Sequence, residues 1–138
     1  MDDVSAISFT VPGKPAPQGS KRHVGRGILI ESSREVGPWR ERIALAAHNA
    51  MHCAAQPLLG CAVDVHLDFV MPRPKSTPRE TPAATKRPDI DKLARAALDA
   101  ITSVVIADDS QVVGLRVTKR LALPDEQPGM NAEVCWSE

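Results

Sequence analysis

Residues 61–70 read C-A-V-D-V-H-L-D-F-V, and the strict alternation of apolar and polar residues in this stretch decides the fold. Successive side chains of a β-strand point to opposite faces. One face therefore carries Val63, Val65, Leu67 and Phe69, and the other carries Asp64, His66 and Asp68. The pattern predicts a half-buried strand in a sheet with one wet face.

Helical spacing is found on both sides of this strand. Pro38 suits the first turn of a helix over about residues 37–55. A second helix is expected over about residues 90–103. The predicted apolar stripes are Trp39, Ile43, Ala47, Ala50 and Met51 in the first helix, and Leu93, Ala94, Ala97, Leu98 and Ile101 in the second. Between strand and second helix, residues 71–88 hold five prolines and predict a long irregular loop.

Further strands are expected near both ends of the chain. Residues 6–12 alternate, residues 26–31 are short and apolar, and residues 130–136 fit a last short strand. A turn at 107–110 is followed by a strand with Val113, Leu115 and Val117 on one face. The order predicts an α+β fold: a single domain over residues 1–138 with a mixed sheet and two main helices.

Composition narrows the class of protein. The 138 residues are 43% hydrophobic and 25% charged, which is ordinary for a soluble globular protein. The three cysteines form no C-x-x-C pair, which argues against a disulfide framework and favours a reducing, cytoplasmic setting. No apolar run approaches the ~20 residues that a membrane span needs. The acidic start, M-D-D-V-S, is not that of a secretory signal.

The charges are balanced but unevenly placed. The chain has 17 basic and 17 acidic residues, and 14 of the basic ones lie in segments 14–42 and 73–95. This segregation favours a local basic face that could meet nucleic acid, although scattered solvated charges are the alternative. The chain has two Trp, two Phe and no Tyr, which is few aromatic side chains on which bases could stack. We therefore expect contacts to backbone phosphates instead.

Two acidic pairs are candidate metal ligands. Asp89 and Asp91 lie at the Pro-led entry to the second predicted helix, where capping is the alternative explanation. Asp108 and Asp109 lie at the next turn, where turn chemistry is the alternative. Carboxylates are the ligands that Mg²⁺ prefers, and such ions assist phosphodiester hydrolysis.

A helix of 12–14 residues spans ~20 Å, which would hold the two pairs apart. For the two pairs to bind one metal, either residues 104–107 run back alongside the helix, or the metal is shared between two subunits. Arg95, one turn after Asp91, could stabilise charge on a phosphate or form an ion pair with Asp99.

Two other patterns favour simpler explanations. His48 and His52, with Cys53 beside them, have a spacing that zinc could use, but no fourth ligand is indicated and an exposed helix face is favoured. Residues 13–22 lack the spacing of a P-loop, so no nucleotide cofactor is expected.

Three blocks together resemble the RusA family of Holliday junction resolvases. That family carries [KR]-P-D-x-D-N-L-x-K-x-x-x-D-A-L and then D-D-x-Q. Here the corresponding stretches are R-P-D-I-D-K-L-A-R-A-A-L-D-A-I (87–101) and A-D-D-S-Q-V-V-G-L-R-V-T-K (107–119). The stretch F-T-V-P-G-K-P-A-P-Q-G-S-K-R (9–22) resembles the family's opening strand and basic loop. Lys92 stands where the family has Asn, and Arg95 where it has Lys.

The resemblance implies a homodimeric, Mg²⁺-dependent endonuclease, with Mn²⁺ as an alternative ion, that nicks four-way DNA junctions symmetrically in recombination and repair. It also implies a bacterial or phage-infected cell as the setting. The matching metal ligands are Asp89, Asp91 and Asp109, with Asp108 adjacent, and Arg95 takes the place of the catalytic lysine. The candidate DNA contacts are Lys14, Lys21, Arg22, Arg73, Lys75, Lys86, Arg87 and Lys92.

Two other functions stay open at this point. The departures at Lys92 and Arg95 are also compatible with a protein that binds branched DNA on the same fold without efficient cleavage. A generic metal-dependent phosphohydrolase acting on nucleotides would use the same acids but would bind DNA without steep salt dependence.

Overall fold

The computed structural model describes residues 4–19, 21–23, 29–31, 34–78 and 84–137. The strands are β1 (Val4–Pro12), β2 (Lys21–His23), β3 (Leu29–Glu31), β4 (Val63–Met71), β5 (Val112–Leu121) and β6 (Gly129–Ser137). The helices are α1 (Val36–Cys53), α2 (Ile90–Ile101) and a short 3₁₀ turn, η1 (Asp109–Gln111). Among these described helices, none has both the length and the apolar character needed to cross a membrane.

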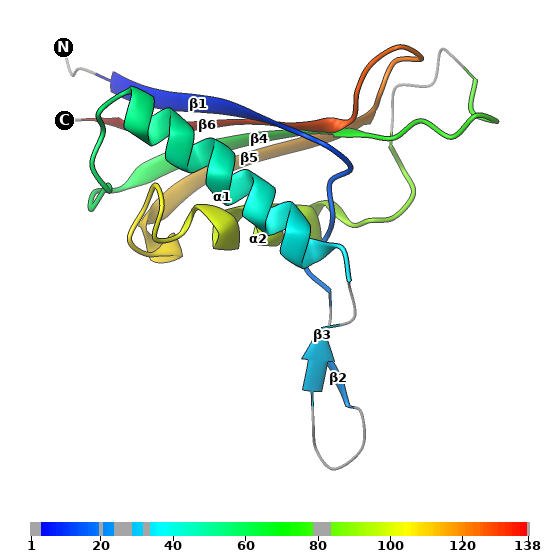
Figure 1. The fold of residues 1–138 in the computed structure, drawn as a ribbon, viewed down its shortest axis with the longest axis horizontal. Coiled ribbons are helices and arrows are strands. Elements are labelled where there is room, and N and C mark those ends of the chain that lie inside the picture. The colour runs from blue at the N-terminus through cyan, green and yellow to red at the C-terminus, as the bar shows by residue number, and fades with distance from the viewer. Residues whose placement is uncertain (1–3, 20, 24–28, 32–33, 79–83, 138) are drawn as a thin grey trace.

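The main sheet has four strands in the order β1-β6-β4-β5 (Figure 1). Strand β6 pairs antiparallel with both β1 and β4, whereas β4 and β5 run parallel, so the sheet is mixed. Strands β2 and β3 form a separate antiparallel pair that extends away from the sheet (Figure 1). The predicted α+β fold with a mixed sheet and two helices is confirmed.

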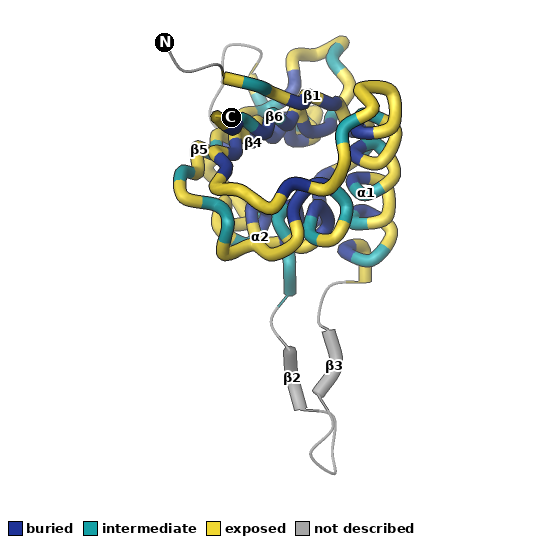
Figure 2. Tube along the Cα trace, turned by 90° about the vertical axis from the view of Figure 1, so that its left-hand side faces the viewer, coloured by how far each residue is buried: buried dark blue, intermediate teal, exposed yellow. Residues whose placement is uncertain are grey.

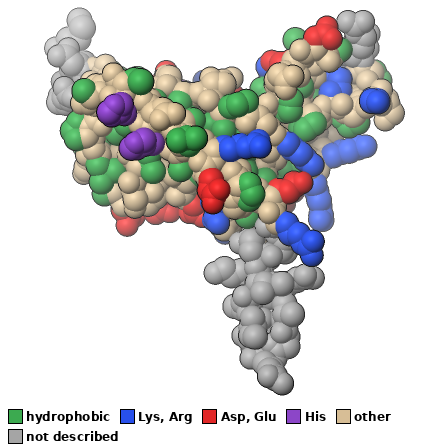
Figure 3. Space-filling view, viewed as in Figure 1, with side chains coloured by type: hydrophobic (Ala, Val, Ile, Leu, Met, Phe, Trp, Pro, Cys, Tyr) green, Lys and Arg blue, Asp and Glu red, His purple; other side chains and the backbone are tan. Residues whose placement is uncertain are grey.

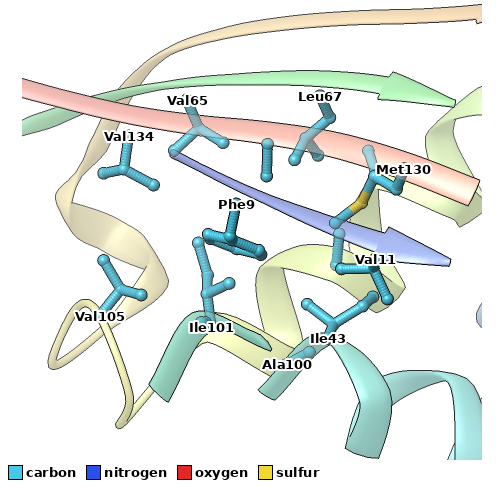
Figure 4. Packing of buried hydrophobic residues seen from close by; sticks show 14 of the residues in the cluster. Phe9, Val11, Ile43, Val65, Leu67, Ala100, Ile101, Val105, Met130 and Val134 are labelled. Carbon is cyan, nitrogen blue, oxygen red and sulfur yellow. The ribbon is translucent and has the colours of Figure 1, made fainter. Parts of the chain in front are cut away.

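Both long helices cover the same face of the sheet, and the core lies between them and the strands (Figures 1 and 2). The predicted apolar face of β4 is buried: none of its four side chains is more than 1% exposed. Figure 4 shows Val65 and Leu67 above Ile43 of α1 and Ile101 of α2, with Phe9 and Met130 beside them. Burial of this continuous apolar layer is the main source of stability.

The expectation for residues 26–31 is met only in part, because residues 29–31 form β3 and residues 24–28 lie outside the described chain.

The strand predicted after the turn at 107–110 is present as β5. Leu115 and Val117 are aligned with Val65 and Leu67 of β4, so they share a face as predicted. Val113 is nevertheless 70% exposed and Leu115 is 47% exposed, because β5 is the last strand of the sheet and has a strand neighbour only on its β4 side. Alternation predicts the strand but carries no information on its place at the edge of the sheet.

Replacing Phe69 with Ala should lower the free energy of unfolding by about 3–5 kcal/mol, because this fully buried ring sits in the central strand. Urea denaturation measures the change. Leu45→Ala is the matched control, since Leu45 is 61% exposed and should change stability by no more than about 0.5 kcal/mol. Equal effects of the two substitutions would contradict the assigned core.

Candidate active site at the start of helix α2

Asp89 and Asp91 are both exposed at the N-terminal end of α2. Asp89 occupies the N-cap position, yet its side chain makes no capping hydrogen bond. Within the described part of the chain, neither carboxylate has a hydrogen-bond or ion-pair partner. Asp89 therefore does not cap the helix with its side chain, and its carboxylate oxygens are available to a ligand.

Asp89 borders a groove of about 500 Å³ between the loop after β1 and the start of α2. The groove is lined by Lys14, Pro15, Pro17, Gln18, Gly19, Glu35, Arg87, Pro88, Asp89 and Lys92. It therefore gathers three of the predicted DNA-contact residues around one predicted metal ligand. Figure 3 shows lysine and arginine side chains, with acidic ones among them, on the surface near the base of the β2–β3 pair.

Hydrogen bonds fix both walls of the groove. The Gln18 backbone N–H donates to the Lys92 carbonyl (3.0 Å), which ties the loop after β1 to α2. The Arg40 guanidinium of α1 donates to Gln18 Oε1 (3.0 Å) and lies 3.7 Å from the Asp99 carboxylate. Gly13 begins the loop with a φ of +119°, where a side chain would be strained and would collide with Arg42. The loop is thus held by both helices.

Lys119 of β5 holds the other approach to the groove, and sequence reasoning did not single it out. Its ammonium donates to the carbonyls of Lys86 (2.9 Å) and Pro88 (2.7 Å). The Pro88 carbonyl belongs to the residue immediately before Asp89, so Lys119 fixes the chain at the entry to α2. The signal was present in the sequence: a lysine alternates with Val117 and Leu121 on the half-buried face of the strand.

In the second acidic pair, Asp108 and Asp109, one carboxylate is engaged in a local turn. The Ser110 N–H donates to Asp108 Oδ1 (2.8 Å), and the Asp108 N–H donates to Gln111 Oε1 (2.8 Å), which together form a capping box at η1. The Ser110 backbone and hydroxyl lower the pKa of Asp108. The turn-chemistry explanation therefore fits Asp108, while Asp109 is exposed beside it.

The two acidic pairs lie at opposite ends of α2. The 12 residues of this helix span ~18 Å. Its first turn lies near Lys119, late in β5, and its last turn leads back to η1 at the start of β5. In the described residues, no group of three His, Cys, Asp or Glu side chains could hold a metal.

Residues 104–107, which follow α2, do not bring the two acidic pairs together. Residues 104–107 pair with Leu59 at the far end of α2, where the Leu59 N–H donates to the Val105 carbonyl (2.9 Å) and the Ala107 N–H donates to the Leu59 carbonyl (3.3 Å). Of the two ways to unite the acids, a return alongside the helix is excluded within one chain. Sharing between subunits stays open.

The remaining basic candidates lie in several places. Lys86 lines a second hollow that shares Lys14 and Arg87 with the groove. Lys75 is exposed on the loop after β4, whereas Arg73 is half-buried and donates to the carbonyls of Ala122 and Pro78 (2.6 Å each). Lys21 and Arg22 belong to β2, but their side chains lie outside the described part.

Two alternatives from the sequence can now be compared with the structure. Arg95 is exposed, and Asp99 pairs with Arg40, so the alternative of an Arg95–Asp99 ion pair is not met in the structure. His48 and His52 are exposed and stack with ring centroids 6.5 Å apart. The described chain offers these histidines no third ligand.

Replacing Lys119 with Met should free the carbonyls of residues 86 and 88 and lower the free energy of unfolding by about 1–3 kcal/mol. Amide hydrogen exchange should rise at residues 86–91 in the same variant. Arg116→Met is the control, because Arg116 is exposed on the same strand and bonds to no described residue. An unchanged exchange rate in Lys119→Met would show that Lys119 does not hold the entry to α2.

Comparison with known proteins identifies a family and a relative. A curated relative from Bacillus subtilis (strain 168), named "Uncharacterized protein YqaN", is 28% identical over 127 residues, covering 84% of this chain and 88% of the relative. The family described as Endodeoxyribonuclease RusA matches residues 12–134, which include the loop, α2, η1 and β5. The match covers most of the chain, and the chain therefore belongs to the RusA endodeoxyribonuclease family.

Proposed function

We propose that this protein is a Mg²⁺-dependent, structure-selective DNA endonuclease that resolves four-way junctions by paired symmetric nicks in recombination and repair. The observation that carries the proposal is the pair of exposed carboxylates at the start of α2, of which Asp89 lines a groove with Lys14, Arg87 and Lys92. Family membership gives the reaction class, a nuclease acting on DNA. In this proposal the nuclease domain takes up the whole chain, residues 1–138.

The donors at this end of α2 suit a hard divalent cation. Mg²⁺ in proteins usually takes one or two carboxylates and keeps several waters, and Mn²⁺ accepts the same oxygen ligands. Asp89 and Asp91 would hold the ion, and Asp109 would join them as a further ligand where the metal is shared between two subunits. Asp108 is the weaker candidate because one of its oxygens already accepts from Ser110. When bound, the ion would supply a Lewis acid that activates water and stabilises the leaving oxygen.

The protein's own side chains would bind and orient the DNA. Lys14, Arg87 and Lys92 border the groove, and Lys86 lies next to it. These cations would contact backbone phosphates, which positions the strand without reading its sequence. Lys21, Arg22 and Lys75 would extend the contact surface, whereas Arg73 would act mainly by holding its loop.

A homodimer suits the substrate. A four-way junction has near two-fold symmetry, and a two-fold dimer would present two equivalent sites to opposed strands. Each site would nick one strand, which gives the paired symmetric cuts of junction resolution. The rival functions are a junction-binding protein with impaired cleavage, favoured by Lys92 and Arg95, and a phosphohydrolase acting on nucleotides.

Asp91→Asn should reduce cleavage of a labelled four-way junction in Mg²⁺ by at least about 100-fold, because it removes one metal-binding carboxylate. Junction binding in a gel-shift assay should be preserved or tightened, since a negative charge is removed from the DNA face. Asp125→Asn is the control, as Asp125 is exposed in the turn between β5 and β6.

Wild-type protein that binds the junction but leaves it uncut in Mg²⁺ and Mn²⁺ would favour the binding protein. Hydrolysis of nucleotides with salt-insensitive, weak DNA binding would favour the phosphohydrolase.

Arg95→Lys should raise the cleavage rate if the side chain acts on the substrate, because an ammonium concentrates the charge that the family places there. The exposed side chain of Arg95 makes no ion pair with a described residue, so folding should not change. Single-turnover cleavage at saturating protein measures the rate. An unchanged rate would assign Arg95 to the solvated surface of α2.

A further inference from the structure

A second hollow, of about 340 Å³, adjoins the groove that Asp89 lines. It lies at the end of the sheet where β4 and β5 finish (Figure 1). Lys14, Arg87 and Pro88 line both spaces. A ligand in this hollow would therefore lie next to the entry of α2 and to the candidate metal ligands.

The walls of the second hollow are mostly apolar. Two hydroxyl side chains, Thr77 and Thr85, also belong to the lining. Such a lining suits a flat ring, because apolar side chains contact its faces while a few hydroxyls pair with its polar edge. The thioether of Met71 adds a favourable contact to an aromatic ring. The apolar residues that line the hollow are Met71, Pro72, Pro74, Ala84, Pro88 and Leu121.

Hydrogen bonds hold these walls in place. Arg73 Nε donates to the Ala122 carbonyl (2.6 Å), and the Ala122 N–H donates to the Met71 carbonyl (2.8 Å), which ties the loop after β4 to the end of β5. Lys119 donates to the two carbonyls on either side of Arg87 (2.9 and 2.7 Å). The hollow is therefore preformed, and a ligand is spared the cost of ordering it.

The charge of the lining has one sign. Lys14, Lys86 and Arg87 are exposed, and none of the described residues that line the hollow is acidic. An apolar space with cations at its border matches the two parts of a nucleotide, a flat and weakly polar base and an anionic phosphate.

We propose that the second hollow takes one extruded base of the DNA, from a nucleotide next to the phosphate that is cut at Asp89 and Asp91. The proposal rests on the proposed function for the place of the cut. Lys14 and Arg87, which line both spaces, would hold the phosphate that joins this nucleotide to the cut. The hollow would add one base contact to the phosphate contacts of the groove.

The state of the base explains a preference for branched DNA. In a continuous duplex each base is paired and stacked on both sides, and it must be unstacked before it can enter a hollow. At the branch point the strands exchange partners and the stack is interrupted, so extrusion costs less there. The backbone phosphates are alike in linear and branched DNA. The hollow would therefore distinguish two structures that phosphate contacts alone do not.

The fluorescence of 2-aminopurine, an adenine analogue that brightens when it leaves the base stack, tests the extrusion. The analogue is placed in turn at each position next to the branch point, and the full chain is added without divalent metal, so that no cut occurs. Binding of wild-type protein should raise the fluorescence at least about 3-fold at a position beside the branch point, and not in a linear duplex. Absence of a rise at every position would overturn the proposal.

Thr85→Phe fills the hollow from an exposed position, so the chain should still fold, as circular dichroism checks. This variant should abolish the rise and weaken junction binding in a gel-shift assay by at least about 10-fold, while linear-duplex binding stays within about 2-fold. Ser76→Phe is the matched control, because Ser76 is exposed on the same loop and does not line the hollow. A folded Thr85→Phe protein that keeps the rise and the affinity would overturn the proposal.

An abasic nucleotide at the responding position separates base binding from a general effect of the substitution. Wild-type protein should bind the abasic junction as weakly as Thr85→Phe binds the intact one. Thr85→Phe should lose nothing further, since the base that it excludes is already absent. Equal losses in the two proteins on removal of the base would overturn the proposal.

These measurements require binding but no cleavage. A wild-type protein that gives the fluorescence rise but cuts no junction in Mg²⁺ would contradict the proposed function and leave the base-binding hollow supported. The monophosphate of 2-aminopurine riboside tests the other source of the same chemistry. Its tight binding, lost in Thr85→Phe and accompanied by no rise in the junction, would assign the hollow to a free nucleotide and overturn the proposal.

Discussion

The packing of α2 antiparallel to β5 is the constraint on which the arrangement of this protein depends. Six of the helix's 12 residues are buried, including Leu93 and Ile101, and their burial holds this face of the helix against the sheet. The antiparallel direction of the helix in turn sends Asp89 and Asp91 to the end of β5 where Lys119 lies, and Asp109 to the other end. No side-chain rotation can undo a separation set by the length of a packed helix.

The groove depends on a smaller set of hydrogen bonds. Lys119 holds the chain before Asp89, and the Gln18–Lys92 bond holds the loop after β1. Arg40 links this loop to α1, and its contact with Asp99 leaves Arg95 without that partner. Lys119, Arg40 and Arg73 thus hold neighbouring segments by hydrogen bonds, whereas Lys75, Lys86 and Arg87 are exposed. This difference between hydrogen-bonded and exposed basic side chains cannot be read from a count of charges.

Asp89 and Asp108 show why a residue type in a suitable place does not determine its use. Both occupy N-cap positions, one at α2 and one at η1. Only Asp108 makes the capping hydrogen bond, because the tight 3₁₀ turn brings the Ser110 N–H to 2.8 Å from its carboxylate. The sequence left capping as the alternative to metal binding for Asp89 and Asp91, and turn chemistry as the alternative for Asp108 and Asp109. The structure gives different answers for the two pairs.

The sequence by itself determined the elements and the family. Period-2 alternation specified β4, helical spacing specified α1 and α2, and the spacing of the acids carried the resemblance that the family match over residues 12–134 confirms. These features are local, because a strand or helix buries one face whatever its neighbours are. The order of the strands, the exposed edge of β5, the role of Lys119 and the distance between the acids were decided only by the tertiary structure. They depend on which segments pack side by side, and contacts between residues far apart in the chain leave no period in the sequence to read.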